Sequence, residues 1–124
     1  MTNNNYNDEA RQEYRLEGGE VVYIELESSD TQGLGGKFLI SRCVDISANG
    51  FQVIADEPLR VEAIHQVCIQ LDRPRCSIYM VAEVMWSRLS ESECNEYMIG
   101  LRLYESKDTD IIKWKEVIAE RCAP

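Results

Sequence analysis

Two short segments of the chain contain the residues best suited to bind a small charged ligand. The first runs from Arg11 to Arg15 (RQEYR), and the second from Asp45 to Gly50 (DISANG). A carboxylate accepts the two neighbouring N–H groups of a guanine Watson–Crick edge. A guanidinium fits guanine O6 and N7, binds phosphate and stacks on a base. Asp45 and Ser47 are two residues apart near the end of an expected strand, so their side chains leave the same face.

Three other patterns lack what their chemistry requires. The segment 33–37 (GLGGK) resembles a phosphate-binding loop, but Phe38 follows where Ser or Thr is needed, so a hairpin loop is favoured. The five cysteines form no Cys-x-x-Cys pair, and no metal site is predicted. His65 is the only histidine. A Cys–His hydrolase that uses it remains an alternative, although no spacing supports one.

Composition limits the partners. The 124 residues include 13 Lys+Arg and 22 Asp+Glu, a net charge of −9, which argues against DNA, RNA and anionic membranes as partners. The longest apolar run is Ile78 to Ala82, too short for membrane insertion. The N-terminus has no secretion signal, and the cysteines are odd in number and scattered. These features favour a cytoplasmic location.

Six short apolar stretches with turn signals between them predict a small antiparallel β-barrel or sandwich. Within the second stretch, Phe38, Ile40 and Val44 alternate on the expected apolar face, which Arg42 interrupts. The six predicted strands are 21–27, 37–45, 51–55, 67–71, 77–86 and 97–104.

The last segment changes to a helical period. From about Thr109, the residues Ile111, Trp114 and Ile118 form one apolar stripe, typical of an amphipathic helix that packs on a core. At the other end, residues 1–10 are polar and include three consecutive asparagines, which predicts a flexible arm. We therefore expect this arm to precede a single domain over residues 11–124.

Here the chain resembles a known family. RQEYR is similar to the Arg-x-x-x-Arg signature of PilZ domains, and DISANG to their Asp/Asn-x-Ser-x-x-Gly signature, in the same order. The resemblance extends over nearly the whole chain, including 84–86 and 99–101 in later strands. PilZ domains are receptors for the bacterial second messenger cyclic di-GMP. The resemblance implies a mainly β fold, a six-stranded antiparallel β-barrel with a C-terminal α-helix and a flexible N-terminal arm.

The resemblance also implies a binding role without catalysis, cofactor or metal. The residues that would bind cyclic di-GMP are Arg11, Arg15, Asp45, Ser47 and Gly50. Asn49 and Trp86 would be secondary contacts, although packing on the barrel is the more common role for such a tryptophan. Binding would change the conformation of the N-terminal arm and thereby regulate an unidentified partner protein in motility, biofilm or polysaccharide output.

One position departs from the family pattern. Ala10 lies where many members have another basic residue, which bears on how many ligand molecules bind. An alternative role is that of a PilZ-like protein–protein adaptor that does not bind nucleotide, although such members usually lack the arginine signature that this chain keeps. An enzyme, the Cys–His hydrolase, is the less favoured alternative.

Overall fold

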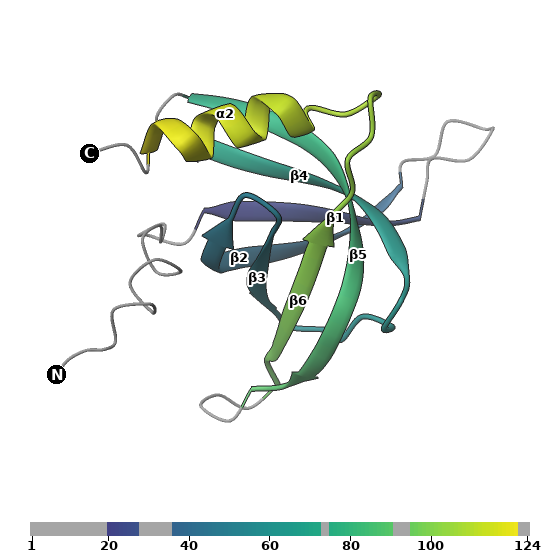
Figure 1. Ribbon diagram of the computed structural model, residues 1–124. Coiled ribbons are helices and arrows are strands. Elements are labelled where there is room, and N and C mark those ends of the chain that lie inside the picture. The colour runs from purple at the N-terminus through teal and green to yellow at the C-terminus, as the bar shows by residue number, and fades with distance from the viewer. Residues whose placement is uncertain (1–19, 28–35, 73–74, 91–94, 122–124) are drawn as a thin grey trace, which may run out of the picture.

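In the part of the chain that the structure describes, six antiparallel strands and one helix make up the fold (Figure 1). The computed structural model describes residues 20–27, 36–72, 75–90 and 95–121. The strands close into a barrel in the order β1-β2-β3-β6-β5-β4. The elements are β1 (Val21–Glu27), β2 (Lys37–Ser47), β3 (Gly50–Ala55), β4 (Ile64–Asp72), β5 (Arg75–Leu89), β6 (Tyr97–Leu103) and α2 (Ile111–Arg121). The predicted six-stranded barrel with a C-terminal helix is thus confirmed, while the predicted arm lies outside the described residues.

The core of the barrel is formed by alternate residues of every strand. In β1 the inward residues Val22 and Ile24 have no exposed surface, and β4 continues this layer with Val67 and Ile69. Because side chains alternate across a strand, each strand contributes one face to this interior. The most deeply buried of these barrel side chains are Val22, Ile24, Cys43, Val53, Ile69, Ile78, Met80, Ala82, Val84 and Ile99.

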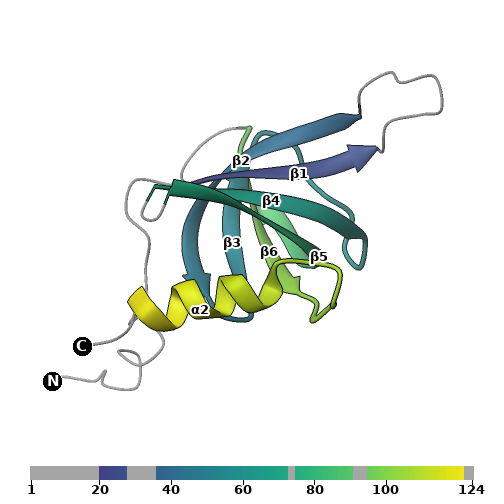
Figure 2. The ribbon, with the colours of Figure 1, turned by 90° about the horizontal axis from the view of Figure 1, so that it is seen from above.

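The helix α2 lies against one end of the barrel (Figures 1 and 2). The predicted stripe of Ile111, Trp114 and Ile118 is buried. The Trp114 ring meets Phe51 of β3 edge to face, with centroids 5.9 Å apart. Its Nε1 donates a hydrogen bond to the main-chain oxygen of Ser47, at 3.3 Å. The helix is therefore attached directly to the end of β2.

The predicted apolar face of β2 is wrong. Phe38 and Ile40 are 53% and 63% exposed, whereas Leu39, Ser41 and Cys43 point into the barrel. The interior accepts Ser41 because its hydroxyl donates to the main-chain oxygen of Val22, at 2.9 Å, so no buried polar group is left unpaired. The inward face of β2 is therefore the one with the buried Ser41, and not the one with Phe38 that hydrophobicity alone favours.

Truncation of Trp114 tests the attachment of the helix. We expect Trp114→Ala to lower the free energy of unfolding by about 3–5 kcal/mol, since it removes a fully buried ring. Urea unfolding followed by circular dichroism measures this change. Ile112→Ala, on the exposed side of the same helix, should change stability by less than about 0.5 kcal/mol. Equal effects of the two substitutions would contradict the packing of α2.

Candidate functional site

A β-bulge in β2 turns the second motif to the outside of the barrel. Cys43 pairs with Val53 of β3, and the next pair is Asp45 with Gln52, so Val44 is an extra residue. An extra residue reverses the inward and outward alternation of the strand. Cys43 is buried before the bulge, whereas Asp45 is only half-buried after it. The bulge thereby frees the Asp45 carboxylate from the core.

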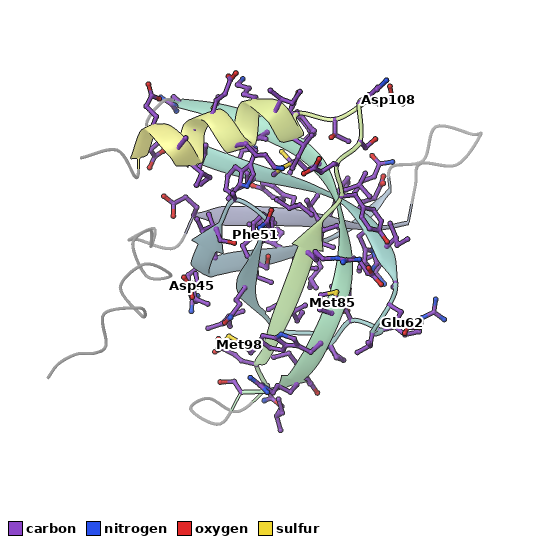
Figure 3. The ribbon with its side chains drawn as sticks, viewed as in Figure 1. Asp45, Phe51, Glu62, Met85, Met98 and Asp108 are labelled. Carbon is purple, nitrogen blue, oxygen red and sulfur yellow. The ribbon has the colours of Figure 1, made fainter. Side chains whose placement is uncertain are left out.

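The residues after the bulge form a tight hairpin. Ile46 is buried and Ser47 is exposed, so Asp45 and Ser47 share the outer face, as predicted. The Asp45 Oδ1 atom accepts a hydrogen bond from the main-chain N–H of Ile46 at 3.0 Å, and the Ser47 hydroxyl donates to the Gly50 carbonyl at 3.2 Å. Both side chains are therefore oriented by their own hairpin. Figure 3 shows Asp45 at the end of β2, and Phe51 in the barrel beneath α2.

Gly50 is required by the neighbouring strand. A Cβ atom at this position would lie 2.2 Å from the carbonyl oxygen of Leu101 in β6. Since a main-chain oxygen cannot move away cheaply, only glycine lets β3 and β6 approach this closely. The glycine of the motif thus allows β3 and β6 to pair closely beneath the hairpin.

An open cleft of about 650 Å³ lies over this hairpin. This volume falls within the range of about 300–1,000 Å³ that is usual for small-ligand sites. The cleft is lined by every residue that was predicted to contact the ligand and that lies in the described part of the chain. Its walls include Asp45, Ser47, Asn49, Gly50 and Trp86. The remaining two predicted residues, Arg11 and Arg15, lie outside the described residues.

Trp86 forms one wall of the cleft and is not part of the barrel core. Its indole lies directly against Gly100 of β6, where a Cβ atom would be 2.4 Å from the ring atoms Nε1 and Cε2. The Arg88 guanidinium carbon lies 4.4 Å from the ring centroid, a cation–π contact. Trp86 is therefore half-buried, with an arginine stacked on its ring.

Sequence reasoning missed a charged residue that lines the cleft. Arg102 of β6 pairs with Gly50 across the β3–β6 ladder and lines the cleft. Its guanidinium forms a 2.8 Å ion pair with Glu83 of β5, which also accepts a hydrogen bond from the Tyr104 hydroxyl at 3.2 Å. Among the described residues that line the cleft, Arg102 is the one with a positive charge. Only the pairing of β3 with β6 could have indicated this position.

None of the described cysteines is hydrogen-bonded to His65. The Nδ1 atom of His65 is 2.8 Å from the main-chain oxygen of Glu25, and its Nε2 atom has no partner among the described residues. Burial raises the pKa of the Cys43 thiol to about 12, and the Glu20 and Asp45 carboxylates add to the shift. A thiol with this pKa is protonated at neutral pH and is a poor nucleophile. No cluster of three metal-binding side chains occurs in the described ranges.

The fold is a small antiparallel β-barrel domain with an open cleft on its outer wall. The sequence matches the PilZ domain family over residues 9–119, and the chain belongs to this family. PilZ domains bind cyclic di-GMP and are binding and adaptor domains rather than enzymes. The matched range includes both motifs seen in the sequence. No curated protein matches the chain. In the described residues, no helix is long and apolar enough to cross a membrane.

Gly100→Ala tests the seat of Trp86. The added methyl group would overlap the indole, so we expect displacement of the ring and a loss of stability of about 1–3 kcal/mol. Acrylamide should then quench the tryptophan emission more strongly. Trp86→Phe identifies the part of the emission that comes from Trp86 rather than from Trp114. Unchanged quenching in Gly100→Ala would show that the ring does not rest on this glycine.

The raised pKa of Cys43 predicts a loss of stability at alkaline pH. The folded state favours the protonated thiol, so its contribution is complete below the ordinary value of 9.0 and is lost as the pH rises towards about 12. Over this range the contribution falls by up to about 1.4 kcal/mol per pH unit. Urea unfolding at several alkaline pH values measures it. In Cys43→Ala the decline should be smaller, and an identical decline would refute the assignment.

Proposed function

We propose that this chain is a cyclic di-GMP receptor that binds its ligand in the cleft above the β2–β3 hairpin. The observation that carries the proposal is the bulge at Val44, because it turns Asp45 and Ser47 together into a cleft whose floor is Gly50. Membership of the PilZ domain family supports cyclic di-GMP as the ligand.

The hairpin would recognise guanine. The Asp45 carboxylate would accept the two adjacent N–H groups of the base, a match that adenine does not offer. The Ser47 hydroxyl, which is bonded to Gly50 at 3.2 Å, would turn to donate to or accept from the ligand. Asn49 lies on the exposed turn beside them and would add a polar contact. The open backbone at Gly50 would let the base approach closely.

Arginines would recognise the phosphates and the other edge of guanine. Arg11 and Arg15 would contact O6, N7 and phosphate, each charged hydrogen bond contributing about 1.5–3 kcal/mol. Arg102 also lines the cleft, and its guanidinium would exchange part of its ion pair with Glu83 for a contact with a phosphate. A second base would stack on the Trp86–Arg88 pair, since a guanidinium plane stacks on a base as an aromatic ring does.

The signal would leave through the N-terminal arm. Closing the arm over the ligand costs about 1–2 kcal/mol for each backbone residue that is ordered, which the arginine contacts would offset. The arm and ligand together would then form a new surface for a partner protein, in motility, biofilm or polysaccharide output. No bond is made or broken in this mechanism, so we expect no catalysis.

Calorimetric titration with cyclic di-GMP tests the proposal. We expect binding by the wild type and at least about a tenfold loss of affinity in Arg15→Ala and in Asp45→Ala, because each removes a charged contact. Asp56→Ala and Arg60→Ala are matched controls, since both residues are exposed and neither lines the cleft. Both should bind like the wild type. A flat titration of the folded wild type would overturn the proposal and favour the adaptor that does not bind nucleotide.

A further inference from the structure

A second face of the barrel, formed by β2, β1, β4 and β5, is unusually apolar for an exposed surface. Four outward residues lie in one row across these strands, because Ile40 pairs with Tyr23, Tyr23 with Cys68, and Cys68 with Tyr79. Phe38 lies beside this row, two residues along β2. We refer to these five residues as the aromatic row.

Three large hydrophobic side chains of the aromatic row are exposed to solvent. Ile40 and Tyr79 are 63% and 60% exposed, and Phe38 is 53% exposed. A hollow of about 240 Å³ lies on the same face, where the small Cys68 stands between Tyr23 and Tyr79. Contiguous exposed apolar surface of this kind marks sites of protein association. The charged residues around the row indicate which kind of partner such a surface would bind.

The face around the row carries balanced charge in a chain of net charge −9. The charged residues beside the row include two acids, Glu25 and Asp110, and two bases, Lys37 and Arg42. The pair that matters for the orientation is Glu25 and Arg42. They lie on opposite sides of the row, since Glu25 pairs with Phe38 and Arg42 with Val21. Two strongly acidic chains repel each other over most of their surface, and this face lets them meet without that penalty.

We propose that the aromatic row is the interface of a symmetric dimer of this chain. A two-fold axis that runs along the row places it against itself and brings Glu25 of each copy towards Arg42 of the other. A symmetric interface requires this kind of self-complementary pattern. We expect a dissociation constant in the micromolar range, about −8 kcal/mol of binding free energy. The cleft with Asp45 is built on other strand positions, so dimer formation does not depend on the proposed ligand.

The geometry predicts that Cys68 lies near its own copy. Sheets that pack face to face are about 10 Å apart, so two half-buried Cys68 thiols on the axis lie within reach of a short bismaleimide. The full-length wild type should give a cross-linked dimer with this reagent, and Cys68→Ser should not. Peptide mapping of the cross-linked product identifies the joined residues. A product joined through any other cysteine, or none at all, would contradict the orientation.

Sedimentation equilibrium measures the association itself. We expect the wild type to move from the 14.3 kDa monomer towards twice that mass over the micromolar range. Ile40→Glu and Tyr79→Glu should each raise the dissociation constant at least about tenfold, because they place acids on the row. Ile112→Glu is the matched control, an exposed isoleucine on α2 that should not affect association. A wild type that stays monomeric, or a dimer unaffected by both row variants, would overturn the proposal.

A charge exchange tests the reciprocal pair. Glu25→Arg alone should weaken the dimer, as should Arg42→Glu alone, and the double variant Glu25→Arg/Arg42→Glu should restore much of the association. Restoration requires that the two positions meet across the interface, which loss of stability cannot imitate. A double variant as weak as the sum of the two single variants would show that Glu25 and Arg42 do not pair between copies.

Discussion

The site depends on one irregularity in hydrogen bonding, the bulge at Val44. Without an extra residue there, Asp45 and Ser47 would continue the inward series of Leu39, Ser41 and Cys43. A carboxylate in that position would be buried without a partner, at a cost of several kcal/mol. The bulge removes this cost and gives the same two side chains an outward direction. Two polar side chains directed to the cleft and a dry barrel interior are thus reconciled at one position.

The core and the ligand hairpin are joined by the same residue, Trp114. Its ring packs on Phe51, the residue after Gly50, and its Nε1 donates to the main-chain oxygen of Ser47. The hairpin is therefore supported from inside by a fully buried side chain while its outer side faces the cleft. Such support restricts the number of conformations that the hairpin can adopt before a ligand arrives.

The wrong prediction for the inward face of β2 has a physical cause. Phe38 and Ile40 are more hydrophobic than Leu39 and Ser41 taken together, so hydrophobic alternation favoured the wrong face of β2. The choice was made by pairing with β1, where Val22 and Ile24 already occupy the interior. Where both faces of a strand are apolar, alternation carries little information and the neighbouring strand decides. The helix had one apolar stripe, and its buried residues were predicted correctly.

The kinds of element and the two motifs of the family could be recognised from the residues alone. Period two and period 3.6 are local properties, so β1 and the stripe on α2 could be read from the residues alone. Which residues face the cleft depends on the folded chain, because strand register and the bulge arise from pairing between distant segments. The position of Arg102 beside Gly50 and of Trp86 on Gly100 follows from these pairings, for which a single sequence holds no local signal.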